Sequence, residues 1–176
     1  MSPEYYARLH DGPTYQENNW LLPEIDTVLS CSPKSVLELG FGNGRFIRAA
    51  SERVERVVGV DWVKSPLAED MPNNVELVVA DATKATLPSV DLACSADVLE
   101  HFSPEVISGV LARLHQAAPC NFHVIACYDD GHSHLTISTP QEWLSRFKLL
   151  SPKYELRKTI PRRKNKNHMV AVISNY

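Results

Sequence analysis

Three short apolar runs in the first half of the chain end in residues that could bind a ligand. The run at residues 35–39 leads into a turn with glycines at 40, 42 and 44, where the backbone can approach a molecule that a Cβ would exclude. The next two runs end at Asp61 and Asp81. A carboxylate there can accept hydrogen bonds from a ribose hydroxyl pair or an adenine amino group, and Trp62 offers an apolar face to a purine.

The glycine turn differs from two common nucleotide-binding motifs. A dinucleotide fingerprint, G-x-G-x-x-G, would need glycine where Arg45 stands, and no Gly-Lys-Ser/Thr follows as a P-loop would require. Alone, such a turn could simply join a strand to a helix. Its combination with Asp61 and Asp81 at successive strand ends is far more specific and predicts a nucleoside site there.

Strands and helices must alternate to bring these ends together. Buried β-branched runs separated by helical patterns predict an α/β fold, mostly parallel with an antiparallel edge. A Ser103-Pro104 start and a Thr139–Glu142 capping box mark two helix beginnings. The residues up to Pro13 look irregular or weakly helical. We expect strands at 35–39, 56–60, 75–80, 90–94 and 122–127, a final hairpin at 154–160 and 169–174, and helices at 15–29, 43–53, 64–70, 103–117 and 139–147.

Length and composition favour one globular domain. The chain has 176 residues with 44% hydrophobic and 22% charged side chains, which excludes disordered and coiled-coil classes. We expect an N-terminal lid or helix at 1–30, an α/β core at 31–150 and a C-terminal hairpin at 151–176. No apolar run approaches about 18 residues and the first residues are polar, so we expect a cytoplasmic protein without a membrane span.

The net charge of −3 is unevenly distributed. Residues 157–166 hold six of the 18 lysines and arginines and no acid, so the rest of the chain is acidic. This distribution argues against a nucleic-acid binder, and the basic segment is either a solvated hairpin turn or a clamp for an anionic acceptor. Aromatic side chains near the N-terminus are expected to pack or to form a lid: Tyr5, Tyr6, Tyr15 and Trp20.

The motifs ELGFGNG, VVGVD, VVAD and CSADVLEHF resemble those of class I S-adenosylmethionine-dependent methyltransferases, most strongly from Val36 to Phe102. The resemblance implies a three-layer, Rossmann-like fold with a seven-stranded sheet whose last strand is antiparallel. It implies S-adenosyl-L-methionine as cofactor, with the methionine part near Glu38, the ribose at Asp61 and the adenine at Asp81. The expected cofactor-binding residues are Glu38, Gly40, Phe41, Gly42, Gly44, Asp61, Trp62, Asp81, Ala82, Ser95 and Ala96.

The acceptor is expected to be a hydroxyl. Amino-methylating DNA enzymes carry an Asn/Asp-Pro-Pro-aromatic signature, and Ser-Ala-Asp-Val stands here instead. A hydroxyl needs a base, for which His101, Asp97 and His134 are the candidates, with His132 nearby. The stretch after His134 resembles small methyltransferases associated with sugar and cell-envelope gene sets. We therefore expect O-methylation of a saccharide or other small hydroxylated acceptor, possibly anionic, by a monomer or homodimer.

Two alternatives remain open. Asp97, Glu100 and His101 have the spacing of the Glu-x-x-Glu-His metal ligands in small-RNA 3′-terminal and some quinone-pathway methyltransferases, and His132 or His134 could complete such a set. In the simpler interpretation the two acids are solvated or cap a helix, and the expected site contains no metal. The third hypothesis is a non-catalytic, cofactor-binding subunit that assists another methyltransferase.

Overall fold

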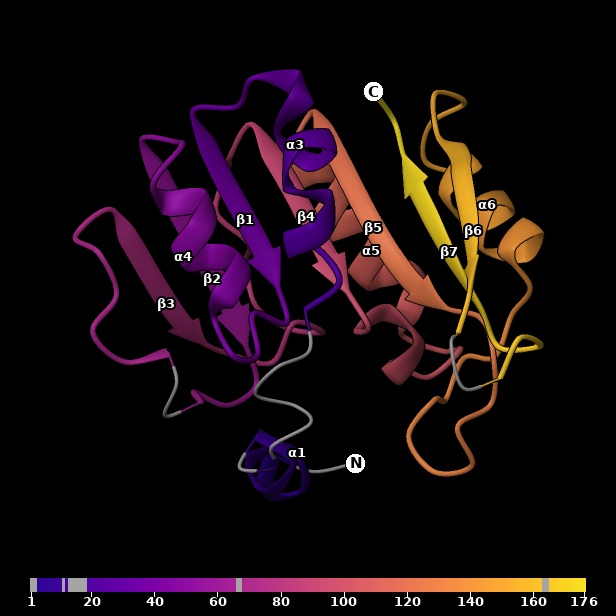
Figure 1. Ribbon diagram of the computed structural model, residues 1–176. Coiled ribbons are helices and arrows are strands. Elements are labelled where there is room, and N and C mark those ends of the chain that lie inside the picture. The colour runs from indigo at the N-terminus through magenta and orange to yellow at the C-terminus, as the bar shows by residue number, and fades with distance from the viewer. Residues whose placement is uncertain (1–2, 11, 13–18, 66–67, 163–164) are drawn as a thin grey trace.

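A computed structural model describes residues 3–10, 12, 19–65, 68–162 and 165–176. It contains one seven-stranded sheet in the order β3-β2-β1-β4-β5-β7-β6 (Figure 1). All neighbouring strands are parallel except that β7 is antiparallel to both β5 and β6. The predicted α/β fold with an antiparallel last strand is therefore confirmed. The strands are β1 Ser35–Leu39, β2 Arg56–Asp61, β3 Val75–Val79, β4 Leu92–Ala96, β5 Cys120–Ala126, β6 Glu155–Pro161 and β7 Met169–Ser174.

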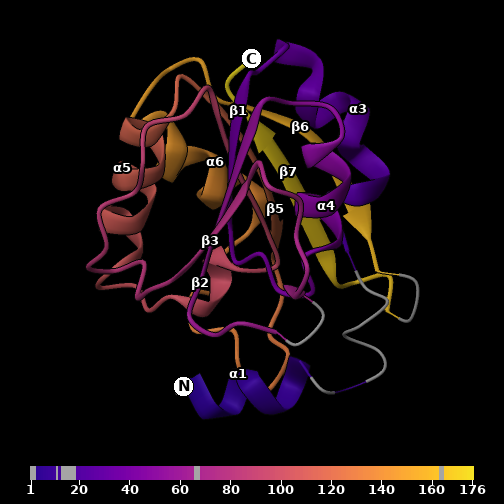
Figure 2. The same cartoon turned by 90° about the vertical axis from the view of Figure 1, so that its left-hand side faces the viewer.

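Helices cover both faces of this sheet (Figure 2). On one face lie α4, Arg45–Ser51, and the short α3, Ile25–Val28, with the 3-10 turns Leu22–Glu24 and Leu29–Cys31. On the other face lie α5, Ile107–Ala117, and α6, Pro140–Lys148. Successive strand residues point to opposite faces, so each face packs its own apolar cluster against its helices.

The strand order reverses between β1 and β4. The chain runs outward from β1 through β2 to β3, then returns to pair β4 with the other side of β1. The loops after β1 and β4 consequently leave the sheet in opposite directions and leave a crevice at their carboxyl ends, where ligands bind in open α/β sheets. The helix α1, Pro3–His10, lies beyond these ends of the parallel strands (Figure 1).

Three helix predictions need correction. The helix expected at 15–29 is partly outside the described residues, and from 22 onward it is divided into two 3-10 turns around α3. No α-helix occurs in the described part of 64–70, whereas a regular helix, α1, occupies the start of the chain. The Ser103-Pro104 sequence forms a turn, and α5 begins only at Ile107 without a side-chain cap.

The predicted capping box is confirmed at the start of α6. The Glu142 backbone N–H donates to Thr139 Oγ1 at 3.3 Å, and the Thr139 N–H donates to the Glu142 carboxylate at 2.7 Å. These contacts satisfy two backbone donors that a helix start leaves without partners. Among the described residues, no helix is long and apolar enough to cross a bilayer.

Candidate functional site

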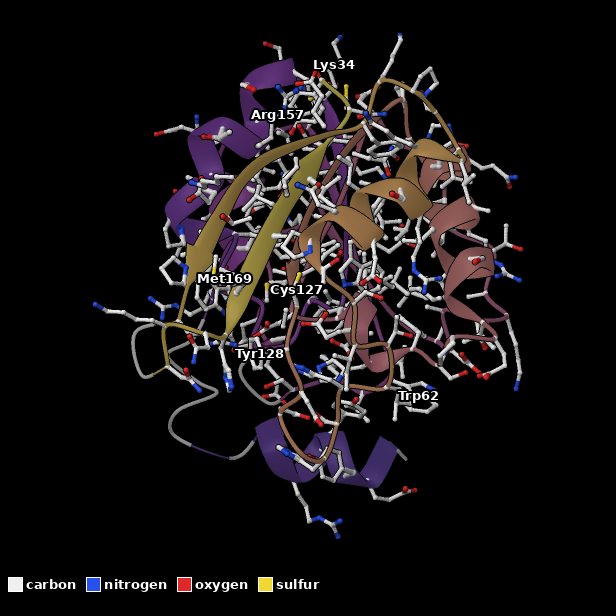
Figure 3. All side chains as sticks on the ribbon, turned by 90° about the vertical axis from the view of Figure 1, so that its right-hand side faces the viewer. Lys34, Trp62, Cys127, Tyr128, Arg157 and Met169 are labelled. Atoms are coloured by element: carbon white, nitrogen blue, oxygen red, sulfur yellow. The ribbon has the colours of Figure 1, made fainter. Side chains whose placement is uncertain are left out.

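A cavity of about 600 Å³ opens at the carboxyl ends of the parallel strands, at the point where the strand order reverses. Its volume lies within the range of small-molecule sites. Figure 3 shows Trp62 and Tyr128, two residues of its wall, at the end of the molecule next to α1, with Lys34 and Arg157 at the opposite end. The wall consists of Tyr6, Asn19, Trp20, residues 38–43, 60–62, 80–83, 96–98, 101–103, Tyr128, Asp130, residues 133–135 and Arg162.

The glycine turn brings bare backbone to this cavity. Gly40 has φ +73° and Gly42 has φ +48°, in the left-handed region that glycine adopts without strain. The Gly40 N–H donates to the Val60 carbonyl at 2.7 Å, which fixes the turn against β2. A Cβ at residue 40 would lie 2.2 Å from Val98 Cγ2, so the turn and the loop after β4 can pack together only with glycine here.

Glu38 places a buried carboxyl group in the cavity wall at the end of β1. Its Oε2 has no hydrogen-bond partner among the described residues. Burial, reinforced by the nearby Asp61 carboxylate, raises the pKa of Glu38 well above its usual range. A cationic or N–H donor from a ligand would supply the missing partner and favour the ionised form.

Asp61 is the last residue of β2, and Asp81 follows β3, as the sequence predicted. Asp61 accepts from the Gly42 N–H at 2.9 Å and from the Trp62 N–H at 2.6 Å, so it joins the loops after β1 and β2. Carboxylate oxygens accept more than one hydrogen bond each, so a ligand diol can share this group. Asp81 accepts from the backbone and hydroxyl of Thr83 at 2.9 and 2.7 Å, which lowers its pKa and keeps it ionised.

Most of the predicted nucleoside-binding residues line one wall. The cavity lining includes Glu38, Gly40, Phe41, Gly42, Asp61, Trp62, Asp81, Ala82 and Ala96. It does not include Gly44, which has φ +70° and precedes α4, or Ser95. Ser95 is fully buried, and its hydroxyl is 2.9 Å from Nδ1 of the buried His123 on β5. The Ser95 side chain therefore does not line the cavity, and contact between Ser95 and a cofactor stays a prediction.

The three predicted catalytic residues lie together across the cavity. His101 Nδ1 is 3.0 Å from the Ser133 carbonyl oxygen, and His134 Nδ1 is 2.6 Å from the Tyr128 carbonyl oxygen. A carbonyl can only accept, so each Nδ1 carries a proton, and Nε2 is the nitrogen with the lone pair in the neutral form of each ring. The ring centroids are 5.0 Å apart. Burial lowers the pKa of His101, so its imidazole is neutral at pH 7.

Asp97 is held by a partner that sequence reasoning did not identify. The residue has φ +55°, and its carboxylate accepts from Arg162 at 3.1 Å. The Arg162 guanidinium lies 4.6 Å from the centre of the Trp20 ring and 5.5 Å from that of Tyr128, distances at which cations are attracted to aromatic faces. The only sequence signal for Arg162 was its place in the basic segment, and Tyr128 gave none.

Glu100 completes a group of possible metal ligands. One carboxylate oxygen of Glu100 and one ring nitrogen each of His101 and His134 all lie within 4.8 Å of one another. His132, the other candidate histidine, is exposed and does not line the cavity. The site thus has a wall suited to a nucleoside and, opposite it, a group of imidazoles and acids suited to a reacting molecule.

Known methyltransferases resemble this chain in sequence and in fold. Residues 36–121 match the model of a family described as a methyltransferase domain. A 1,6-didemethyltoxoflavin-N1-methyltransferase of Burkholderia thailandensis is 22% identical, with a TM-score of 0.73 over 99% of this chain and 90% of that chain. The N-methyltransferase NodS of Bradyrhizobium japonicum is 14% identical, with a TM-score of 0.70 over 98% and 97%.

Curated relatives match only in part. Phosphoethanolamine N-methyltransferase 1 of Triticum aestivum is 29% identical over 103 residues, which cover 52% of this chain and 21% of that protein. The chain spans about a fifth or less of the length of the curated relatives it matches. The family match over residues 36–121 and the sheet with its single antiparallel strand identify a methyltransferase domain with the class I, S-adenosylmethionine-dependent fold.

Proposed function

We propose that the protein transfers a methyl group from S-adenosylmethionine to a hydroxyl of a small acceptor, a saccharide or a comparable hydroxylated molecule. The observation that carries this proposal is the pairing of two walls in one cavity. Glu38, Asp61 and Asp81 line it from the ends of β1, β2 and β3, and the imidazoles of His101 and His134 line it from the segments after β4 and β5, on the other side of the point where the strand order reverses. A nucleoside cofactor on the first wall would direct its reactive end toward the second.

The residues of the first wall fit S-adenosylmethionine. The buried Oε2 of Glu38 lacks a donor, which the ammonium group of the methionine part can supply. Asp61 and Asp81 offer carboxylate acceptors to the ribose hydroxyls and the adenine amino group. The two solved relatives named above were both crystallised with S-adenosylhomocysteine, the molecule that remains after methyl transfer.

The second wall fits an acceptor that must lose a proton. When bound, S-adenosylmethionine supplies an electrophilic methyl carbon: the acceptor oxygen bonds to it while the carbon–sulfur bond breaks and its electron pair stays on sulfur. Nε2 of His101 or His134 can receive the proton of the acceptor hydroxyl. Arg162 holds Asp97 in place beside them.

Methylation of an amine is the second candidate. The named relatives are N-methyltransferases, and a neutral amine needs less help with its proton than a hydroxyl does. The two imidazoles with basic Nε2 atoms favour oxygen, since they would be superfluous for a neutral amine. Radiolabelled methyl transfer to a panel of saccharides, phenols and amines separates the two. His101→Ala should lower turnover more than cofactor affinity if the acceptor is a hydroxyl.

Calorimetric titration with S-adenosylhomocysteine tests the cofactor site. Asp61→Ala should weaken binding by about 1–3 kcal/mol, roughly 5- to 150-fold, the scale of lost hydrogen bonds to a charged group. Asp26→Ala is the control, because Asp26 pairs with Arg53 at an exposed position outside the cavity. Equal affinity of all three proteins would contradict the ribose assignment. Tight binding without turnover on any acceptor would instead favour a cofactor-binding partner subunit.

A further inference from the structure

We propose that Glu100, His101 and His134 bind one divalent transition-metal ion at the acceptor end of the cavity. Their three donor atoms lie within 4.8 Å of one another. Bonds of about 2.1 Å place donors on one ion at most about 4.2 Å apart, so small side-chain rotations would bring all three onto it. Two imidazole nitrogens and one carboxylate oxygen suit zinc, manganese or iron(II) better than calcium or magnesium.

Both histidines are already oriented as metal ligands usually are. A metal-bound imidazole typically donates its other ring N–H to a carbonyl or carboxylate, which fixes the tautomer and the ring plane. Here His101 donates to the Ser133 carbonyl at 3.0 Å and His134 donates to the Tyr128 carbonyl at 2.6 Å. This leaves Nε2 of each neutral ring as the nitrogen that can bind a cation.

Glu100 provides a second and independent observation. Its side chain is completely buried, and Oε1 accepts from the Ala126 N–H at 2.9 Å. Oε2 is buried without any hydrogen-bond partner among the described residues. A buried oxygen without a donor costs folding free energy. A bound cation would remove this cost and stabilise the carboxylate.

Two neighbouring acids, Asp97 beside Glu100 and Asp130 beside His134, have further hydrogen-bond partners of their own. Asp97 accepts from Arg162, and Asp130 accepts from three backbone N–H groups in the loop at 132–134 and from the Ser133 hydroxyl. Asp130 Oδ2 is 3.8 Å from His134 Nε2, close enough to add to the negative potential there. The ligand set is therefore Glu100, His101 and His134, rather than the Asp97, Glu100 and His101 set indicated by sequence spacing.

Three protein ligands leave coordination positions open. His101 and His134 line the cavity and Glu100 lies behind them, so the open positions face the space for the acceptor. This is the arrangement of catalytic rather than structural metal sites. An acceptor hydroxyl bound there would lose its proton more readily. Both Nε2 atoms are then ligands and cannot receive that proton, so in this form the ion replaces the imidazole base of the proposed function and the proton passes to solvent. That role rests on the proposed methyltransferase function, whereas binding of the ion does not.

Metal titration of the full chain, first stripped of metal by chelation, tests the site. We expect one ion per chain, detected by calorimetry with Zn²⁺ and by the visible absorption of bound Co²⁺. Glu100→Gln and His134→Ala should each weaken binding at least 10-fold. His132→Ala is the matched control, because it removes an exposed imidazole two residues from His134 and should leave binding unchanged. His101→Asn gives a further test if Glu100→Gln does not fold.

Absence of a stoichiometric ion in the wild-type chain overturns the proposal. An equal loss of metal affinity in His132→Ala and His134→Ala overturns it as well. Titration of the same metal-free protein with S-adenosylhomocysteine separates this inference from the proposed function. Retained cofactor binding with no metal binding refutes the metal site alone. Failure of the metal-free chain to bind the cofactor counts against the methyltransferase proposal, whatever the metal titration shows.

Discussion

At the scale of single residues, Gly40 and Gly131 allow the cost of backbone strain to be measured apart from the cost of a steric clash. Gly40 and Gly131 both have left-handed backbones, with φ +73° and +82°. A Cβ on Gly131 would meet nothing within 4 Å, whereas one on Gly40 would overlap Val98. Gly131→Ala should therefore cost only the conformational strain, about 1–2 kcal/mol. Gly40→Ala should lose more stability, and it should also weaken S-adenosylhomocysteine binding because the displaced Val98 lines the cavity.

Urea denaturation and calorimetry on the two variants check this expectation. The comparison is informative because both variants replace glycine by alanine in the left-handed backbone region, so they differ only in what the added Cβ meets. Similar losses of stability with unchanged cofactor affinity in both variants would show that the turn after β1 tolerates a side chain and has no special role in binding.

The positions of Asp61 and Asp81 at the cavity could be predicted from the sequence, whereas those of Arg162 and Tyr128 could not. Asp61 ends β2 and Asp81 follows β3, and parallel strand ends meet at one edge, so spacing in the sequence was enough to place both residues at the cavity. Tyr128 follows β5 and Arg162 follows β6, the two strands that flank β7. Tertiary packing brings both residues to the cavity. No local pattern reports such packing, and the basic segment around Arg162 looked equally like a solvated turn.

At the scale of elements, strands were predicted better than helices. Runs such as 56–60 and 169–174 contain β-branched residues that favour buried strands in almost any context. The start of α5 was placed too early, because a Ser-Pro pair is equally compatible with a turn, which is what residues 103–106 form. The position of α1 could not be predicted, since it depends on contacts with residues far along the chain.

The pairing of β4 with β5 carries a buried polar contact that makes a pH-dependent contribution to stability. Ser95 and His123 lie opposite each other, and burial lowers the pKa of His123 to about 3. The unfolded chain takes up this proton near pH 6.5, which the folded chain resists, so stability falls as pH drops below about 6.5. Replacing both groups by apolar ones, Ser95→Ala with His123→Leu, should remove this part of the acid sensitivity.

Urea unfolding at pH 7 and pH 5 measures the effect. The free energy of unfolding of the wild type should fall by about 2 kcal/mol more than that of the double variant over this interval. Ser95→Ala alone is the control, because it keeps the buried imidazole and should keep the acid sensitivity. Parallel pH profiles for the wild type and the double variant would show that His123 takes up its proton without opening the core.

At the scale of the whole molecule, the cavity is closed by parts of the chain that lie far apart in the sequence. The sheet supplies the nucleoside wall, the loop at 129–138 supplies His134, and α1 lies across the strand ends (Figure 1). The Tyr6 ring is 6.2 Å from that of Trp62, after β2, and 5.8 Å from that of His101, after β4. One side chain of α1 thus contacts both sides of the crevice.

This placement predicts that α1 controls release of the cofactor more than its capture. Tyr6→Ala removes the ring that lies between Trp62 and His101, so the dissociation rate of S-adenosylhomocysteine should rise about 5- to 10-fold, equivalent to roughly 1 kcal/mol of lost apolar contact. Tyr5→Ala is the matched control, because Tyr5 contacts Tyr6 and His132 but does not line the cavity. Stopped-flow displacement measures both rates, and amide exchange in α1 should slow when the cofactor analogue binds. If both variants release the ligand at the wild-type rate, and amide exchange in α1 does not change when the ligand binds, then the helix takes no part in closing the site.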